Sequence, residues 1–206
     1  MKTISLLLAL AALVTPGMAE DPVFRPLFNG KDLTGWVGGP YTYEGDAIVC
    51  PTTKKGRTLR TEATFTNYIL EFEFKLPANG NNGIGIHYPG QGDPAYTGME
   101  LQILDDSGSK YTKLKDTQYH GSLYTLQPAK KGFLKPVGEW NHQRIEVNGK
   151  SVKVILNGTE ILNADLEDLA LKNKGHKGVN RREGHIALCG HGFAVAFRNM
   201  RIAEIK

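Results

Sequence analysis

Alternation of apolar and polar residues with a period of two is the main pattern along this chain. In NYILEFEFKLP every second residue is apolar, and between these residues stand Ile69 and three charged residues; the apolar set is Tyr68, Leu70, Phe72, Phe74 and Leu76. This pattern predicts a strand with one buried face. The stretch WNHQRIEVNGKSVKVILNGTEIL holds the pairs Asn148-Gly149 and Asn157-Gly158 between β-branched runs. Asn-Gly between such runs predicts two successive hairpins.

The remaining segments extend this all-β pattern. Further strands are expected at residues 43–50, 84–88, 99–104, 185–189 and 194–205, and one short helix at 165–174. A two-sheet antiparallel β-sandwich of the jelly-roll type buries one face of so many strands, with the two chain ends side by side. Residues 110–138 lack any sustained period, and we expect them to form an ordered lid.

The first residues are typical of a secretory signal. Lys2 precedes an apolar run at residues 4–14 that is too short to span a bilayer comfortably, and small residues precede Glu20. We therefore expect residues 1–19 to be a signal peptide cleaved near Ala19, with export to the periplasm or the medium. Residues 20–206 are then one domain. No second apolar run is long enough for a membrane helix, so we expect no membrane insertion.

Charge and cysteine content narrow the function classes. Residues 20–206 carry only three more Lys and Arg than Asp and Glu, a balance that argues against nucleic acid as a partner. Cys50 and Cys189 either form a disulfide in an oxidising compartment or are two separate buried thiols. The chain has no H-E-x-x-H, G-x-S-x-G or phosphate-loop motif. No particular oligomeric state is indicated.

The stretch GMELQILDD places polar groups on a predicted strand. Glu100 and Gln102 share one face, because the apolar residues that alternate with them must face the core. In NGIGIHY the same alternation places Gly83, Gly85 and His87 on the outer side. Glycine in a strand often marks the close approach of a ligand or another backbone. A groove lined by His87, Glu100 and Gln102 is the functional interpretation, while an ordinary solvated sheet face is the structural one.

Two further stretches add candidate ligand contacts. The segment QYHGSLY crowds His120 and Tyr124 with other hydrogen-bonding side chains, which suits a polyhydroxylated ligand, and GHIALCGHG adds His191. Asp105 and the residue after it are typical of a turn opening. In a second interpretation, ELQILD is a degenerate form of the E-x-D-x-x-E motif of laminarinase-like β-glucanases. Glu100 and Asp105 have opposite strand parity, however, so a β-bulge would be needed to pair them.

Several stretches together resemble the 3-keto-disaccharide hydrolase domain family from about Phe24 to Lys206. They are LFNGKDLTGW, NNGIGIHY, GMELQILDD, QYHGSLY, GEWN, ILNGTEI and GHGFAVAFRNMRI. The resemblance implies a concanavalin A-like jelly roll and an exported bacterial protein that acts on glycosides whose sugar is oxidised at C3. The substrate would then be a small saccharide or glycoside.

The resemblance also implies a mechanism. A ketone at C3 acidifies the hydrogen at C2, and its removal gives an enolate that expels the glycosidic oxygen from C1. We expect Glu100 or His120 to be the base, with the other assisting. Further substrate contacts are expected from Gln102, Tyr124, His191, His87, His176, Arg181 and Asp105. A divalent metal on the enediolate oxygens is compatible with this chemistry but not required by any spacing. The alternatives are a non-catalytic carbohydrate-binding module and a direct laminarinase-like β-glucanase.

Overall fold

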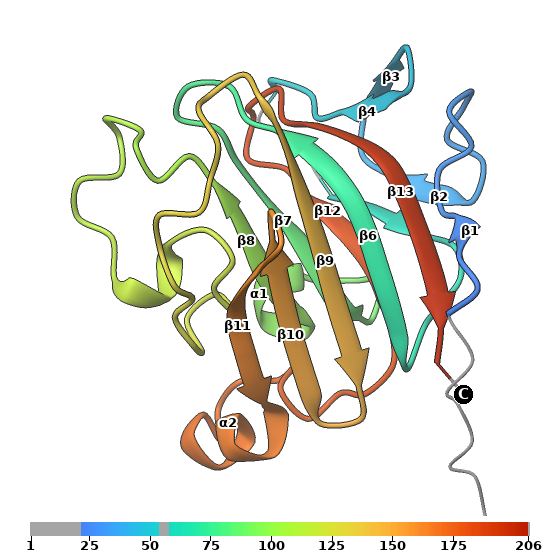
Figure 1. Cartoon of the computed structure of the whole chain (residues 1–206). Helices are drawn as coiled ribbons and strands as arrows, with labels where there is room; N and C mark the ends of the chain where they lie inside the picture. Colours follow the sequence, from blue (N-terminus) through green and yellow to red (C-terminus); the bar gives the residue numbers. More distant parts are fainter. Residues whose placement is uncertain (1–21, 54–57, 206) are drawn as a thin grey trace, which may run out of the picture.

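Two antiparallel sheets pack face to face in the computed structural model, which describes residues 22–53 and 58–205 (Figure 1). The larger sheet has the order β11-β10-β9-β6-β13-β4-β3, with β1 also paired to β13. Its strands are β1 (Arg25–Pro26), β3 (Thr42–Glu44), β4 (Ala47–Val49), β6 (Tyr68–Lys75), β9 (Trp140–Asn148), β10 (Ser151–Leu156), β11 (Thr159–Asp165) and β13 (Ala196–Glu204). The expected two-sheet antiparallel sandwich is confirmed. The expected signal peptide, residues 1–19, lies outside the described residues.

The smaller sheet has the order β2-β5-β12-β7-β8 and carries the candidate site. Its strands are β2 (Trp36–Gly38), β5 (Thr58–Thr61), β7 (Asn81–Tyr88), β8 (Met99–Leu104) and β12 (His185–Cys189). Three short helical segments join the strands, namely α1 (Pro94–Thr97), η1 (Asp116–Gln118) and α2 (Leu166–Lys172). The short helix expected at 165–174 therefore forms as α2, and Asp165 caps it by accepting from the amides of Glu167 and Asp168.

The core lies between the sheets and follows the predicted alternation. The apolar set of β6 is buried there, opposite Ile84 and Ile86 of β7 and Leu101 and Ile103 of β8. Since β-strand side chains alternate between faces, the groups between these residues point away from the core. This fixes the faces of Glu100 and Gln102 on the outer side of the smaller sheet.

Both predicted hairpins are present, with different loops. Asn157 and Gly158 form the two-residue loop between β10 and β11, with positive φ values of 49° and 87°, as a type I′ turn requires. Between β9 and β10 the pairing of Asn148 with Ser151 moves the loop one residue on, to Gly149 and Lys150. Asn-Gly therefore located both hairpins but gave the loop residues of only one.

The single strand predicted at residues 43–50 is wrong in detail, whereas the predicted pairing of the chain ends is confirmed. Residues 43–50 form not one strand but the β3–β4 hairpin, because Gly45 has a φ of 61° and turns the chain. Near the ends, β1 pairs with β13 through Arg25 and Ile202, so the two ends of the described chain lie side by side as expected.

Part of the loop at residues 110–138 continues the smaller sheet beyond its edge strand β8. The amide of Gln102 donates to the carbonyl of Ser122, and the amides of Gly121 and Tyr124 donate to the carbonyls of Gln102 and Glu100. The loop is thus held against β8 by backbone hydrogen bonds. This pairing brings Tyr124 next to Glu100.

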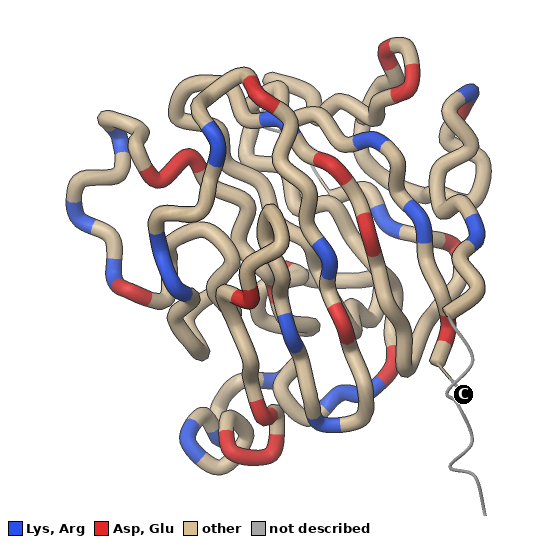
Figure 2. The backbone as a smooth tube through the Cα atoms, viewed as in Figure 1, with Lys and Arg blue, Asp and Glu red and all other residues tan. Residues whose placement is uncertain are grey.

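The outer face of the larger sheet carries interspersed positive and negative side chains along β9, β6 and β13 (Figure 2).

Cys50 and Cys189 are both buried thiols rather than a disulfide, which decides between the two alternatives. Within residues 22–53 and 58–205, no helix has the length and apolar character needed to cross a bilayer.

Candidate functional site

A small pocket of about 120 Å³ lies on the outer side of the smaller sheet, around Glu100. It is smaller than typical whole-ligand sites of roughly 300–1,000 Å³, so it suits the reacting end of a ligand rather than a whole disaccharide. Strands β7 and β8, helix α1 and two loops contribute its lining residues, which are Asn81, Asp93, Ala95, Tyr96, Glu100, Gln102, Tyr124 and His191.

Glu100 is the buried carboxylate of this pocket. The missing side chain of Gly83 makes room for it, because a Cβ added at Gly83 would overlap the Glu100 carboxylate. Glu100 is only 4% exposed, and its Oε1 has no hydrogen-bond partner among the described residues. Nε2 of His191 lies 3.7 Å from Oε1, too far for a direct hydrogen bond.

The surroundings of Glu100 make its carboxylate a better proton acceptor than an exposed one. Burial raises its pKa above the ordinary carboxyl value, His191 opposes the shift, and the negative charge of Asp93 adds to it. A raised pKa makes the carboxylate a stronger base. A buried carboxylate without a hydrogen-bond donor is costly to maintain, and such groups gather at functional sites.

The polar groups around Glu100 are held in place by bonds to one another. Gln102 donates from Nε2 to Oδ1 of Asn81 at 3.1 Å, and the hydroxyl of Tyr124 accepts from Nε2 of Gln118 at 3.1 Å. Tyr96 stands at the rim with 49% of its surface exposed. Amide and phenol groups beside an exposed ring are suited to binding a saccharide.

The family model of the 3-keto-alpha-glucoside-1,2-lyase-like domain matches residues 23–203. The chain belongs to this family. A relative from Bacteroides thetaiotaomicron named 3-keto-disaccharide hydrolase is 29% identical over 223 aligned positions, which cover 85% of this chain and 76% of the relative. The match supports the glycoside hydrolase class for this protein.

Solved structures show the same fold. A candidate glycosyl hydrolase from Parabacteroides distasonis is 26% identical with a TM-score of 0.78, covering 89% of this chain and all of that one. The β-glucanase of Bacillus licheniformis is 12% identical with a TM-score of 0.53, covering 92% of this chain and 100% of the other. The second likeness, at so low an identity, concerns the fold alone.

Asp105 does not line the Glu100 pocket. Its Oδ2 accepts from the amide of Asn79 at 2.8 Å, and its Oδ1 accepts from the amide and hydroxyl of Ser107. The turn interpretation of Asp105 is therefore correct and its expected substrate contact is wrong, because its hydrogen bonds hold two chain segments together. The glucanase-like pairing of Glu100 with Asp105 is likewise absent, since the two line different hollows.

His120 is also displaced from the expected position. Its ring stacks on Phe74 with centroids 5.1 Å apart, Nδ1 accepts from the amide of Leu104, and Nε2 donates to Oε1 of Gln143 at 3.1 Å. Burial lowers its pKa to about 3. The expectation that His120 shares the pocket with Glu100 is wrong, because its ring fills the sandwich interior.

His87 misses the pocket because the strand alternation breaks before it. Tyr88 pairs with His185 and Gly85 with Ala187, so two residues of β7 oppose one of β12 in a bulge. His87 has a φ of 50° and is 1% exposed, and burial lowers its pKa to about 4. The predicted groove of His87, Glu100 and Gln102 is therefore only partly correct.

His176 and Arg181 support the pocket from behind rather than closing over it. Nε2 of His176 lies 3.0 Å from the carbonyl of Ala95, and Nε of Arg181 donates to the carbonyl of Thr97 at 2.9 Å. Both carbonyls belong to α1, whose Tyr96 lines the pocket. The expected direct substrate contact is replaced by a role in holding α1.

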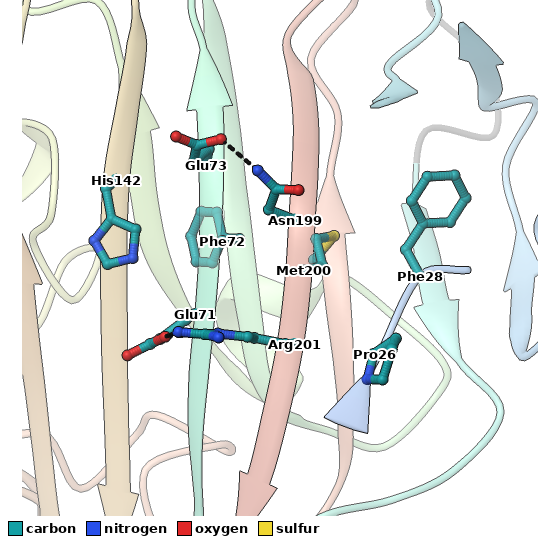
Figure 3. A pocket seen from close by; sticks show the side chains of 9 residues that line it. All are labelled: Pro26, Phe28, Glu71, Phe72, Glu73, His142, Asn199, Met200 and Arg201. Atoms are coloured by element: carbon teal, nitrogen blue, oxygen red, sulfur yellow. Dashed lines mark hydrogen bonds and ion pairs between the residues drawn. The ribbon is translucent and has the colours of Figure 1, made fainter. Parts of the chain in front are cut away.

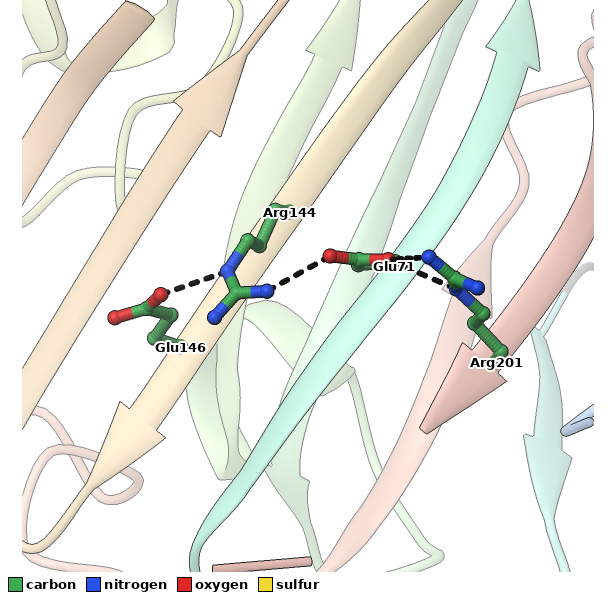
Figure 4. A network of polar contacts seen from close by, with 4 residues as sticks. All are labelled: Glu71, Arg144, Glu146 and Arg201. Atoms are coloured by element: carbon green, nitrogen blue, oxygen red, sulfur yellow. Dashed lines mark hydrogen bonds and ion pairs between the residues drawn. The ribbon is translucent and has the colours of Figure 1, made fainter. Parts of the chain in front are cut away.

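A larger hollow of about 470 Å³ lies on the outer face of the larger sheet (Figure 3). Its carboxylates are already engaged. Oε1 of Glu71 accepts from Arg144 and its Oε2 accepts from two nitrogens of Arg201 (Figure 4), and Glu73 accepts from Arg198 and Asn199. Although burial opposes the shift, Arg144 and Arg201 hold the pKa of Glu71 below its ordinary value. Since Glu73 also has its donors, this hollow offers no unpartnered carboxylate comparable to Glu100.

Sequence reasoning missed Asn81, Asp93 and Tyr96. The Asp93-Pro94 dipeptide is a helix-start signal that would have predicted α1, where Asp93 caps the helix by accepting from the amide of Ala95. Among the described residues, no group of three or more His, Cys, Asp or Glu is arranged to hold a metal ion.

Proposed function

We propose that this protein is an exported enzyme that cleaves the glycosidic bond of 3-keto-glycosides, with Glu100 as the base. The observation that carries the proposal is the buried Oε1 of Glu100, which has no hydrogen-bond donor in the described part of the chain, on a residue that lines a pocket of amide and phenol groups. Family membership supports the substrate class. Glu100 replaces the Glu100–His120 pair expected from the sequence, since His120 is bonded within the core.

The reaction begins at C2 of the oxidised sugar. Glu100 takes the C2 proton, and the electron pair of that bond forms an enolate with the C3 ketone. The enolate electrons then form the C1–C2 double bond and expel the glycosidic oxygen, while the C3 ketone is restored. One carboxylate is sufficient for this step, whereas retaining displacement needs two carboxyl groups. Addition of water across the double bond completes a net hydrolysis.

Neighbouring side chains can supply the remaining roles. His191, whose side chain is 41% exposed and lies next to Glu100, is placed to protonate the departing oxygen. Gln102 and Tyr124 are placed to donate hydrogen bonds to the sugar and its enolate oxygen. Tyr96, exposed at the rim, offers a face for the second ring or aglycone.

The test uses purified protein with a 3-keto-glucoside that carries a chromogenic aglycone. We expect release above the spontaneous rate in the wild type and near the spontaneous rate in Glu100→Gln. Asp105→Asn is the matched control, because it removes a second buried carboxylate that lies outside the pocket. No release above background by the wild type, with and without added divalent metal, would remove the proposal.

Two alternatives give different results in the same assay. A non-catalytic carbohydrate-binding module would bind glycans with Glu100→Gln as well as the wild type and would release nothing. A direct β-glucanase would cleave unmodified β-glucan. Cleavage restricted to the C3-oxidised substrate excludes both.

Export is tested separately. Expression of the full chain with its first 19 residues should give a mature N-terminus at Glu20 in the periplasm or medium. An intact N-terminus on cytoplasmic protein would contradict this part of the proposal.

A further inference from the structure

A second hollow of about 440 Å³ lies where β7 ends and β12 begins. Its volume falls in the range of small-molecule sites, roughly 300–1,000 Å³. Arg181, Arg182, Glu183 and His185 line one part of it, and Tyr88 and Pro89 line another. It is distinct from the Glu100 pocket, with which it shares no lining residue.

The arginines of the described chain fall into two groups. Four of them form ion pairs with carboxylates, and all four belong to the larger sheet; they are Arg25, Arg144, Arg198 and Arg201. Within residues 22–53 and 58–205, the other three, Arg60, Arg181 and Arg182, have no carboxylate partner. Arg181 and Arg182 line the second hollow, and Arg60 stands beside it.

These three guanidinium groups donate to backbone carbonyls, but these bonds use only some of their N–H groups. Arg60 uses one terminal nitrogen on the carbonyl of Thr61, and Arg181 uses only Nε, on that of Thr97. Arg182 uses one terminal nitrogen on the carbonyls of Val179 and Arg181. Each guanidinium has five N–H donors in a planar fork, so at least one nitrogen of each retains free N–H groups.

Arg60 lies close to His185, which lines the hollow, at Gly90. A Cβ added at Gly90 would lie 3.2 Å from Nε2 of His185 and 3.4 Å from Nε of Arg60. The carboxylate in the hollow belongs to Glu183, whose Oε1 accepts from the hydroxyl of Thr64. Two arginines line the hollow and a third stands beside it, against this one lining carboxylate, so the lining keeps a net positive charge.

We propose that this hollow binds the oxyanion of a small acidic ligand, a saccharide with a carboxylate or sulfate group. Guanidinium forks match planar oxyanions bidentately. Half-buried Pro89, next to the buried Tyr88, offers a small apolar surface for the ring that carries the anionic group. The hollow is open and small, about 440 Å³, which fits a small ligand, and the near balance of charge in the whole chain argues against nucleic acid.

Titration of the isotope-labelled mature chain tests the proposal, with glucuronate, inorganic sulfate and neutral glucose as probes. We expect saturable amide shifts with the two anions, centred on Gly184 and His185, and none with glucose. Glucuronate binding tighter than sulfate binding indicates a saccharide ligand. Equal weak binding of both anions indicates an adventitious ion only and overturns the saccharide assignment, as does absence of saturation with both.

Two variants show whether the arginines are responsible. The double change Arg181→Gln/Arg182→Gln should weaken anion binding by about tenfold or more. Arg25→Gln is the control, because it removes one positive charge from an ion pair on the larger sheet. An equal loss in both proteins would mean general attraction to a basic protein and would overturn the proposal. If the double variant unfolds, the position of the shifts in the wild type decides, and shifts away from residues 181–185 count against the site.

Discussion

Replacing Glu100 by Gln removes one buried charge and separates the functional from the structural role of this residue. Glu100 is 4% exposed, and no residue within 22–53 and 58–205 donates a hydrogen bond to its Oε1. A buried charged group without a partner costs more than a neutral one of the same shape. Glu100→Gln keeps the shape and removes the charge, so it should raise the free energy of unfolding at neutral pH by about 1–3 kcal/mol. For a chain of this size each 1 kcal/mol raises Tm by about 2–4 °C. Loss of a general base should lower kcat/KM by about 10²–10⁴-fold.

The stability difference between Glu100→Gln and the wild type should depend on pH. Burial raises the pKa of Glu100 above its ordinary value of 4.5, so the wild type loses stability as the pH rises from 4.5 through the raised pKa. The stability gain of Glu100→Gln should therefore grow with pH, as measured by thermal unfolding between pH 4.5 and 8. Asp105→Asn should instead destabilise the protein by about 1–3 kcal/mol, because Asp105 accepts several hydrogen bonds. Equal destabilisation by both changes, or full activity of Glu100→Gln, would refute the reasoning.

Three further changes test the surroundings of Glu100. Gly83→Ala places a methyl group on the Glu100 carboxylate, so activity should fall at least about tenfold in kcat/KM, and unchanged kinetics would show that the position of Glu100 does not matter. Tyr96→Ala should raise KM for a 3-keto-disaccharide while Tyr96→Phe leaves it near the wild-type value; equal effects of both would contradict a stacking role. His120→Phe should cost about 1–3 kcal/mol through the lost bonds to Leu104 and Gln143. The wild type loses stability as the pH falls below 6.5, because burial holds the pKa of His120 at about 3 and the unfolded chain binds a proton that the folded chain does not. His120→Phe should lose less stability over this pH range, and an unchanged pH profile of unfolding would contradict this.

Strand alternation was enough to predict the faces of β6, β8 and the part of β7 before its bulge. The period of two is a local property of an extended backbone, so the position of Glu100 and Gln102 on the outer face followed from their neighbours Leu101 and Ile103. Gly83 was correctly identified as a position of close approach. The group that approaches it is the side chain of Glu100.

Alternation could not predict positions where the backbone leaves the strand geometry. His87 lies within the bulge of β7, and a single inserted residue reverses the face of those that follow. His120 lies in a loop, where no period relates a side chain to a face, and its burial depends on Phe74 and Gln143 from distant strands. Arg181 likewise bonds α1 through a contact 84 residues away in sequence.

The fate of the C2 hydrogen tests the central claim most directly. A 3-keto-glucoside labelled with deuterium at C2 is incubated with the protein, and label in water and free aglycone are followed together by NMR, with the spontaneous rates subtracted. Removal of the C2 proton by Glu100 predicts that label and aglycone are released together in the wild type, and that both are near background in Glu100→Gln. Release of the aglycone with the C2 deuterium retained would contradict elimination and with it the assigned role of Glu100.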